Sequence, residues 1–380
     1  MGEPRLDWAK AQKRKGKMVR RLTGGVKFLL RKAGVELLHG TARFASPSAL
    51  EVVAEDATER IEAGSYVIAT GSRPALLPIP GLDDPGVMTS QDALALESLP
   101  ETMLIIGGGA IGVEFATLFS VCGVQTTVVE LLPRLLPLLD ADLGAEVERS
   151  LKKAKVATHT ASKVSSVKSL DGKFTVTVES DSQQTTIKVD TVLVAVGRRP
   201  NVENLGLDLA GVLVEKAGIV TDDHMQTNVP NVYAIGDVTG GIMLAHVAMK
   251  EGIVAVENAL GHSSIMNYSA IPACVFTQPE VASVGLSEEQ AAQQGYDLKV
   301  GKFPFAASGK ALVQGESDGF VEIVADGGYD QILGVHIVGP HASDLIQEGT
   351  LALTLESTCD EIEGAIHPHP TLSEALAEAA

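Results

Sequence analysis

The sequence has 380 residues, 45% of them hydrophobic and 4% aromatic, with 38 glycines, 17 prolines and three cysteines. This length suffices for two or three packed domains, and the ordinary charged fraction of 21% excludes a disordered chain. The apolar runs fall short of the roughly 18 residues that a membrane helix needs, which predicts a soluble protein with no membrane partner. The cysteines at positions 122, 274 and 359 are too sparse for a disulfide scaffold and wrongly spaced for a zinc site or a C-x-x-C redox pair.

The net charge of −18 is unevenly distributed along the chain. Eleven Lys or Arg residues against two acidic residues give the first 32 residues a net charge of +9, so the remaining 348 residues carry −27. Such a basic start occurs in transit peptides and nucleic-acid patches, but apolar residues recur in it at helical spacing and favour a solvated amphipathic helix. The acidic remainder would repel a polyanion, which argues against nucleic acid as a partner.

Strand-like and helix-like segments follow in an order that indicates several domains. Short β-rich runs occupy residues 35–44, 49–53 and 66–70, and the Pro- and Gly-rich stretch at 78–86 is typical of a crossover between domains. An apolar strand at 102–106, a glycine-rich turn, a helix ending near Cys122 and a strand at 124–130 then form the start of a βαβ unit. Further strands are predicted at 173–179, 187–189 and 191–196, and the final part, 269–380, has the alternation of an α+β domain, with strands at 273–277, 319–325 and 332–338 and helices at 287–294 and 342–355.

The turn after the strand at 102–106 has the pattern Gly107-x-Gly109-x-x-Gly112. In this context the first glycine permits a tight turn, the second lets the main chain approach a pyrophosphate, and the third lets the helix pack close on the strand. Glu130 closes the next strand, 23 residues after Gly107, where a carboxylate can accept from both hydroxyls of an adenine ribose. Because a carboxylate there repels a 2′-phosphate, the pattern predicts an NAD site rather than an NADP site.

Two further positions have residue types suited to ligand binding or acid–base catalysis. Asp237 follows an apolar strand and Gly236, which predicts a carboxylate at the carboxyl edge of a sheet, as a ligand contact or as a helix cap. His369 lies in a Pro-rich segment with Glu374 five residues later, and a carboxylate at this spacing can orient an imidazole for acid–base chemistry. The residue types alone leave a purely structural role open for this histidine.

Six motifs stand in order along the chain: Ala69-Thr70-Gly71-Ser72, Gly107 to Phe115, Val196-Gly197-Arg198-Arg199-Pro200-Asn201, Ala234-Ile235-Gly236-Asp237, Met243-Leu244-Ala245-His246 and His369-Pro370-Thr371-Leu372-Ser373-Glu374. Together they resemble the flavin-dependent pyridine nucleotide-disulfide oxidoreductases, and most of all the dihydrolipoamide dehydrogenases. The similarity runs through essentially the whole chain and includes residues 22–26 and 276–282.

The resemblance implies an α/β fold with two Rossmann-like nucleotide-binding domains, the FAD domain incomplete and the NAD domain complete, and a C-terminal α+β dimerisation domain. The implied boundaries are 1–82 for the remnant of the FAD domain, 83–200 for the NAD domain, 201–268 for the continuation of the FAD domain and 269–380 for the dimerisation domain. The implied partners are a second copy of the chain and the lipoyl domain of a 2-oxo acid dehydrogenase complex or of the glycine cleavage system. The implied location is the bacterial cytoplasm or, in a eukaryote, an organelle matrix.

The resemblance also implies FAD and NAD as cofactors and assigns residues to them. The positions that match FAD contacts are Gly40, Thr70, Gly71, Ser72, Asp237, Met243, Leu244, Ala245 and His246. The positions that match NAD contacts are Gly107, Gly108, Gly109, Ala110, Ile111, Gly112, Val113, Glu114, Glu130, Val164 and Gly197, with Glu114 beside the nicotinamide. His369 matches the residue that exchanges a proton with the dithiol substrate in the other subunit's active site, and Glu374 matches its partner carboxylate.

The sequence departs from the family pattern in one respect. Family members open with a Gly-rich loop for the FAD pyrophosphate and a helix that bears two cysteines four residues apart, and these 380 residues contain neither. We therefore expect residue 1 to enter the family pattern roughly eighty to one hundred residues late, and the helix at 375–380 to be clipped. Without the redox disulfide, the dihydrolipoyl half-reaction would be lost, and without the first loop FAD would bind poorly.

Several alternatives remain open. Glutathione reductase is disfavoured by Glu130, and a mercury reductase would carry a C-terminal cysteine pair that is absent. A soluble transhydrogenase accommodates the missing cysteines but not the pair His369 and Glu374. The chain could also be a truncated NAD-binding and dimerisation module without turnover.

Overall fold

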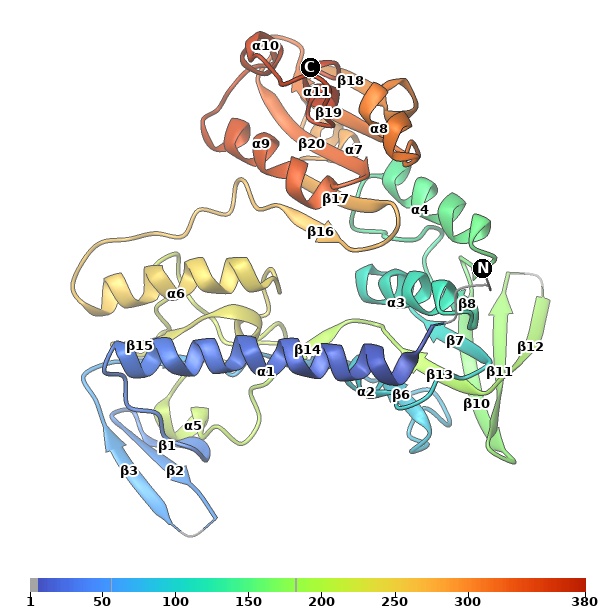
Figure 1. Cartoon of the computed structure of the whole chain (residues 1–380). Coiled ribbons are helices and arrows are strands. Elements are labelled where there is room, and N and C mark those ends of the chain that lie inside the picture. The colour runs from blue at the N-terminus through green and yellow to red at the C-terminus, as the bar shows by residue number, and fades with distance from the viewer. Residues whose placement is uncertain (1–5, 56, 182) are drawn as a thin grey trace. The chain divides into compact units, whose positions relative to one another are not determined.

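The computed structural model describes residues 6–55, 57–181 and 183–380 and is drawn in Figure 1. The chain forms two compact units. Unit 1 consists of the chain up to Pro74 together with Arg198–Asn267, and unit 2 consists of Ala75–Gly197 together with Tyr268–Ala380. Helices and parallel strands occur in both units, which confirms the predicted α/β class.

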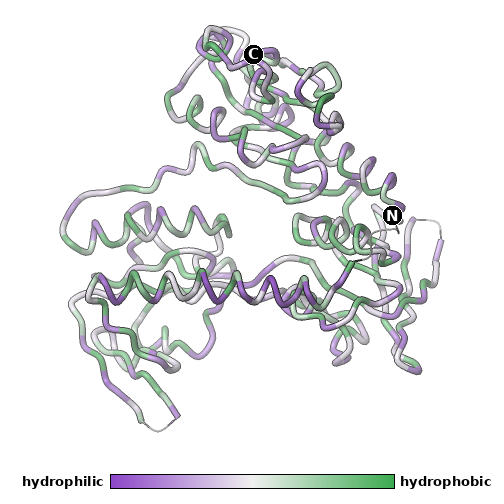
Figure 2. Tube along the Cα trace, in the orientation of Figure 1, coloured by the Kyte–Doolittle hydropathy of each residue, from purple (hydrophilic) through white to green (hydrophobic). Residues whose placement is uncertain are grey.

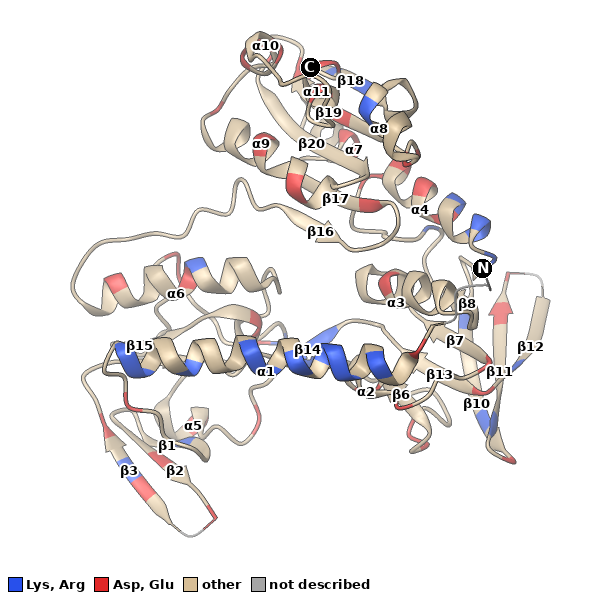
Figure 3. Cartoon of the chain, in the orientation of Figure 1, with Lys and Arg blue, Asp and Glu red and all other residues tan. Residues whose placement is uncertain are grey.

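Unit 1 begins with the predicted basic helix, α1 (Trp8–Lys32). The Asp7 side chain caps its first turn by accepting a hydrogen bond from the main-chain N–H of Lys10 at 3.0 Å, and the chain leaves the helix through Gly34 at φ +71°. None of the helix residues is buried, although Leu22 and others are large and apolar. Figure 2 shows polar and apolar residues mixed along α1, and Figure 3 shows its Lys and Arg residues. Among the described helices, none combines the length and the apolar character needed to cross a membrane.

The rest of unit 1 contains an antiparallel sheet in the order β1-β2-β3, a parallel pair formed by β4 and β15, and an antiparallel pair formed by β5 and β14. In the core of the unit the rings of Phe44 and Tyr66 meet edge to face with centroids 5.6 Å apart. The strand predicted at 35–44 begins only at Thr41, because no described strand pairs with the residues before it. The bounds in this unit are β1 Thr41–Ser46, β2 Ala49–Val53, β3 Thr58–Glu62, β4 Tyr66–Ile68, β5 Ser72–Pro74, β14 Arg198–Pro200, α5 Leu207–Ala210, β15 Val232–Ala234, η1 Gly236–Thr239 and α6 Ala245–Ala259.

The first part of unit 2 is a five-stranded parallel sheet in the order β6-β13-β7-β8-β9. Its central strand β7 (Thr102–Ile106) is buried over its last four residues, as its apolar sequence predicts. α3 (Ala110–Val121) connects β7 to the parallel strand β8 (Gln125–Val129), so the predicted βαβ start is confirmed. An antiparallel sheet, β10-β11-β12, shares a hydrophobic core with the parallel one. The remaining bounds are β6 Val87–Thr89, α2 Ser90–Ala95, α4 Ala141–Lys153, β9 Ala157–His159, β10 Lys163–Leu170, β11 Lys173–Ser180, β12 Gln183–Val189 and β13 Thr191–Val194.

The second part of unit 2 is a five-stranded antiparallel sheet in the order β16-β17-β20-β19-β18. All residues of β20 (Ile332–Gly339) are buried, and α9 (Ala342–Thr354) packs on β17 and β20. The predicted alternation of strands and helices in an α+β domain is therefore confirmed. The remaining bounds are β16 Ala273–Val275, β17 Glu280–Gly285, α7 Glu288–Gln293, β18 Leu298–Pro304, η2 Phe305–Ala307, α8 Gly309–Gln314, β19 Phe320–Asp326, α10 Cys359–Gly364 and α11 Glu374–Ala377.

Candidate nucleotide-binding and acid–base sites

The turn between β7 and α3 is formed by close packing around glycines. Gly107 has φ +110°, and a Cβ at this position would lie 2.4 Å from the main-chain oxygen of Ala195. A Cβ on Gly112 would lie 1.9 Å from the main-chain oxygen of Gly107, because α3 packs directly on the turn. By contrast, a Cβ on Gly109 would meet nothing within 4 Å. The main chain at Gly109 therefore borders open space that a ligand can enter.

The first turn of α3 offers main-chain donors to that open space. Gly109 is the N-cap residue and has no side chain to bind the amides of the first turn. Ala110 is exposed, Ile111 is half-buried, and Val113 is fully buried against the core. An uncapped helix N-terminus beside an open glycine fits a pyrophosphate, which would accept hydrogen bonds from these amides. The residues present thus fit the predicted NAD site.

Glu130 is buried beneath this turn, with 8% of its surface exposed. Its Oε2 accepts a hydrogen bond from the main-chain N–H of Gly108 at 2.6 Å, and its Oε1 accepts one from the main-chain N–H of Leu132 at 2.7 Å. The carboxylate therefore holds the glycine turn in place, a role that the sequence did not predict. Each carboxylate oxygen keeps a further lone pair, so acceptance from ribose hydroxyls remains possible in the same geometry.

Val164 and Gly197, two further positions assigned to NAD, lie in or beside strands of unit 2. Val164 on β10 is 3% exposed, and its side chain belongs to the hydrophobic core, so any contact with an adenine would have to come from its main chain. Gly197 follows β13 with φ +109°, and its main-chain oxygen accepts a hydrogen bond from Ala75 at 2.9 Å.

Glu114 lies one turn into α3 and is partly buried. Its Oε1 accepts a hydrogen bond from the main-chain N–H of Phe276 at 2.9 Å. Burial raises the pKa of the Glu114 carboxyl, and the Phe276 N–H opposes this shift because it stabilises the charged form. The contact joins α3 to the second part of unit 2, and no role was predicted for Phe276.

The residues matched to FAD form a polar cluster at the carboxyl ends of two parallel strands of unit 1. Ser72 follows β4 and Asp237 follows β15, and the Ser72 hydroxyl donates a short hydrogen bond to Asp237 Oδ2. Arg198 Nε donates to Ser72 Oγ at 2.6 Å and lies 3.6 Å from Asp237 Oδ2. The structure thus brings together two predicted residues, Ser72 and Asp237, and adds Arg198, which the sequence showed only as part of a motif. The Asp237 carboxylate is placed to accept a hydrogen bond from a sugar-like hydroxyl, as in the predicted FAD contact.

The remaining positions matched to FAD differ in their surroundings. Gly71 has φ +68° with open space where a Cβ would be, and Thr70 donates its hydroxyl to the main-chain oxygen of Asn201 at 2.9 Å. A Cβ on Gly40 would lie 2.6 Å from the main-chain oxygen of Val53, so packing on the hairpin already requires a glycine there.

Met243, Leu244, Ala245 and His246 lie at the start of α6. Leu244 is the N-cap residue and makes no side-chain hydrogen bond to the first turn, while Ala245 and His246 are exposed. The open space beside Gly71, the amides at the start of α6 and the Asp237 carboxylate together fit part of a flavin dinucleotide site.

His369 and Glu374 form the predicted pair. His369 Nδ1 lies 2.8 Å from Glu374 Oε1, and the other oxygen of Glu374 accepts the main-chain N–H of Thr371 at 2.8 Å. Because a carboxylate can only accept, Nδ1 carries the proton, and Nε2 is left as the basic nitrogen. The His369 side chain is 81% exposed, so Nε2 is open to a partner molecule. The Thr371 N–H, followed by the bond from His369, lowers the pKa of Glu374 and keeps it ionised.

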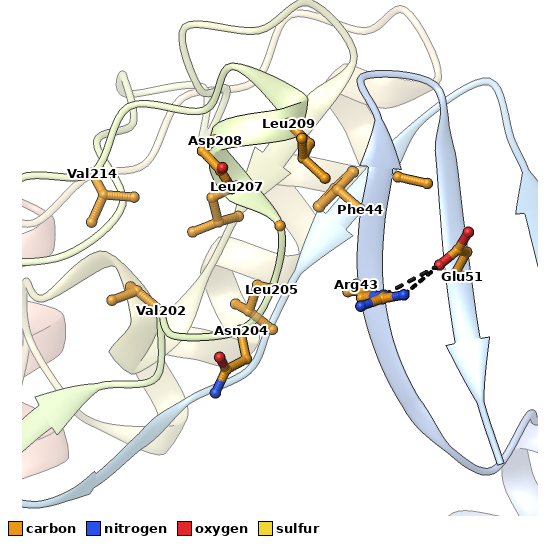
Figure 4. A pocket seen from close by; sticks show the side chains of 12 residues that line it. Arg43, Phe44, Glu51, Val202, Asn204, Leu205, Leu207, Asp208, Leu209 and Val214 are labelled. Atoms are coloured by element: carbon orange, nitrogen blue, oxygen red, sulfur yellow. Dashed lines mark hydrogen bonds and ion pairs between the residues drawn. The ribbon is translucent and has the colours of Figure 1, made fainter.

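A cavity of about 790 Å³ lies elsewhere in unit 1, between the β1–β2 hairpin and residues 202–214. Figure 4 shows Arg43 paired with Glu51 on one wall, where their closest atoms are 2.9 Å apart, and Leu205 and Leu207 on the other. None of the predicted site residues lines this cavity, so its size does not identify the functional site.

The three cysteines are free thiols in the structure. Cys122 and Cys274 are half-buried and Cys359 is buried, and burial raises the pKa of each thiol. A thiol with a raised pKa is a poor nucleophile at neutral pH. None of the three therefore has the environment of a redox-active cysteine.

The chain matches known proteins over nearly its whole length. Residues 4–252 match the family model described as pyridine nucleotide-disulphide oxidoreductase, and residues 271–380 match that family's dimerisation domain, which supports a homodimer. A dihydrolipoyl dehydrogenase of Bacillus subtilis is 41% identical over 99% of this chain and 82% of the relative. A dihydrolipoyl dehydrogenase of Thermus scotoductus is 43% identical over 100% of this chain and 82% of the relative.

Solved structures show the same fold. The Cu(II) complex of the HOCl-induced flavoprotein disulfide reductase RclA of Escherichia coli superposes with a TM-score of 0.92 at 28% identity, over 98% of this chain and 85% of that one. LpdA of Mycobacterium tuberculosis superposes with a TM-score of 0.91 at 26% identity, over 100% of this chain and 84% of that one. The family and its dihydrolipoyl dehydrogenase members use FAD and NAD. The chain belongs to the pyridine nucleotide-disulphide oxidoreductases.

Proposed function

We propose that the chain forms the NAD-binding, acid–base and dimerisation parts of a dihydrolipoyl dehydrogenase. Such an enzyme oxidises protein-bound dihydrolipoamide and reduces NAD⁺. The observation that carries the proposal is the hydrogen-bonded pair of His369 and Glu374, with Nδ1 protonated and Nε2 open. In the same unit, the Gly107–Gly112 turn and Glu130 form a cradle for a dinucleotide. The high identity to dihydrolipoyl dehydrogenases over nearly the whole chain supports this combination.

Each group of site residues has its own role in this reaction. His369 Nε2 takes the proton of a substrate thiol, and Glu374 holds the Nδ1–H and stabilises the imidazolium that results. The amides at Gly109 and Ala110 would hold the NAD pyrophosphate, and Glu130 would accept from the adenine ribose. Glu114, matched to the nicotinamide side, carries a carboxyl whose raised pKa reflects its burial. Ser72, Arg198 and Asp237 would hold the sugar-like chain of FAD, which when bound would pass to NAD⁺ the two electrons that the family's redox disulfide takes from the thiols.

The division into domains stays part of the proposal. We place the FAD domain at 1–82 and 201–268, the NAD domain at 83–200 and the dimerisation domain at 269–380. In the dimer, His369 of one subunit would serve the active site of the other, and the substrate would be a lipoyl domain of a 2-oxo acid dehydrogenase complex or of the glycine cleavage system. A reducing compartment, the bacterial cytoplasm or an organelle matrix, suits three unpaired thiols.

One specific observation favours a second candidate for the 380 residues taken alone. The family's thiol chemistry needs a disulfide, and none of Cys122, Cys274 and Cys359 has a cysteine partner. On that ground the 380-residue chain would bind NADH and dimerise without oxidising dihydrolipoamide.

The test compares the native chain with His369→Gln. The first candidate predicts dihydrolipoamide-dependent NAD⁺ reduction by the native chain and a loss of about a hundredfold or more in His369→Gln, because general acid–base catalysis contributes at least that factor. The second candidate predicts NADH binding by calorimetry without turnover. Full activity of His369→Gln would contradict the assignment of the base, and turnover by the native chain with bound flavin would contradict the second candidate.

A further inference from the structure

A second histidine fixes the loop that presents His369. His367 Nε2 lies 2.8 Å from Glu348 Oε1, and His367 Nδ1 lies 3.0 Å from the main-chain oxygen of Ala365. Glu348 belongs to α9, whereas the two histidines lie in the loop between α10 and α11. The ring of His367 therefore ties this loop to a helix that packs on the central sheet of the domain.

The two contacts hold the His367 ring at both of its nitrogens. Nε2 contacts a carboxylate oxygen of α9, and Nδ1 contacts a main-chain oxygen of the loop itself. The His367 side chain is only 9% exposed, so these contacts lie largely out of water, where a polar contact is costly to break.

Hydrogen bonds connect the residues after His367 to the His369 pair. The Thr371 hydroxyl donates to the main-chain oxygen of Pro368 at 2.7 Å, between the two histidines. The Thr371 N–H donates to Glu374, which also binds His369. The positive charge of His367 adds a small contribution to the lowered pKa of Glu374. The loop is thus held at one end by α9 through His367 and at the other end by Glu374 of α11.

We propose that His367 is a positioning residue for the His369–Glu374 pair: through its contacts with Glu348 and with the Ala365 carbonyl, it fixes the loop on α9 so that His369 Nε2 faces outward. The proposal deepens the proposed function and rests on it for the role of His369. His367 does not meet the substrate. It acts through the position of its neighbour.

Three charged or titratable groups lie around His367. Glu348 faces it from α9, Glu374 interacts with it from α11, and His369 follows it in the same loop. Asp344 lies one turn before Glu348 on α9, but its carboxylate lies 3.6 Å from His341. Asp344→Asn is therefore a matched control, because it removes the same charge from the same helix without touching the His367 contact.

The first measurement is the ¹⁵N NMR signal of the His367 ring in the full chain, with His367→Gln used to assign it. Because Nε2 of His367 contacts the Glu348 carboxylate, Glu348→Ala should shift the Nε2 signal. Asp344→Asn should leave the signal unchanged. An unchanged Nε2 signal in Glu348→Ala would overturn the proposal.

The second measurement reports the position of the loop. Amide exchange at Thr371 should be about tenfold faster in Glu348→Ala than in the native chain, the factor expected when one hydrogen bond that holds a loop is lost. Glu348→Gln should give a smaller increase and Asp344→Asn none. An unchanged rate in Glu348→Ala would show that the loop does not depend on the bridge. Neither readout needs catalysis, so they stand even if His369→Gln proves fully active and the proposed function fails.

Discussion

The glycine turn at 107–112 and the histidine loop at 365–374 are both candidate sites, and they are held in different ways. The turn is fixed by steric contact, since a single added carbon at Gly112 would overlap the main chain, and the buried Glu130 carboxylate supports it from beneath. The loop is exposed and is fixed by polar contacts that two carboxylates make, those of Glu348 and Glu374. Steric packing does not depend on pH, whereas the contacts of ionised side chains depend on their charge.

The largest effect is expected at Gly112. Gly112→Ala places a Cβ 1.9 Å from the main-chain oxygen of Gly107, and this overlap can be relieved only by moving the main chain of the β7–α3 junction. We expect a loss of stability of about 3 kcal/mol or more. Chemical denaturation measures it. A variant as stable as the native chain would show that the turn is less tightly packed than described.

Glu130→Ala should have the next largest effect. It leaves the main-chain N–H groups of Gly108 and Leu132 without their acceptor beneath the turn, which should cost about 2 kcal/mol of stability. The matched control is Glu101→Ala, an exposed carboxylate just before β7, which should change the stability by less than about 0.5 kcal/mol. Equal denaturation midpoints for the two variants would exclude the bracing role of Glu130.

Gly109→Ala separates binding from packing within the same turn. Gly109 has φ −74°, which alanine adopts freely, and a Cβ there meets nothing within 4 Å. We expect unchanged stability and a loss of NADH affinity of about tenfold, or about 1.4 kcal/mol, because the new carbon occupies the space that the pyrophosphate must enter. Calorimetric titration and thermal unfolding of the same sample check both parts. Unchanged affinity would place the dinucleotide elsewhere.

The smallest effect is a pH dependence of the histidine loop. The pKa of Glu374 is lowered from its ordinary value of 4.5, so its contacts stabilise the loop above pH 4.5 and are lost as the pH falls through the lowered value. The NMR shift of the Thr371 amide should titrate with a midpoint below 4.5, and Glu374→Gln should abolish the titration. A midpoint above 4.5 in the native chain would contradict the assigned hydrogen bonds.

The contrast between the two sites also explains what the sequence could predict. The glycine turn is local: its strand, turn and helix are consecutive, so the pattern Gly107-x-Gly109-x-x-Gly112 and the apolar run before it were sufficient to predict these elements. The pair of His369 and Glu374 is also local, five residues apart, and its hydrogen bond agrees with the expectation. A sequence can predict features whose residues all lie within one short segment.

Contacts between distant segments were not visible. The bond from Phe276 to Glu114 joins residues 162 positions apart, and the bond from Arg198 to Ser72 spans 126 positions. Only the order of the strands brings such residues together. The same reason explains the strand predicted at 35–44, which begins at Thr41, because a strand forms only where the fold supplies a partner.

Calorimetric titration of NADH and NADPH into the native chain tests the central assignment most directly, because it depends on both the open glycine and the buried Glu130. We predict that NADH binds at least about tenfold more tightly than NADPH, since the Glu130 carboxylate repels a 2′-phosphate. Glu130→Gln should reduce that preference. Equal affinities for the two dinucleotides in the native chain, or no binding of either, would contradict the account.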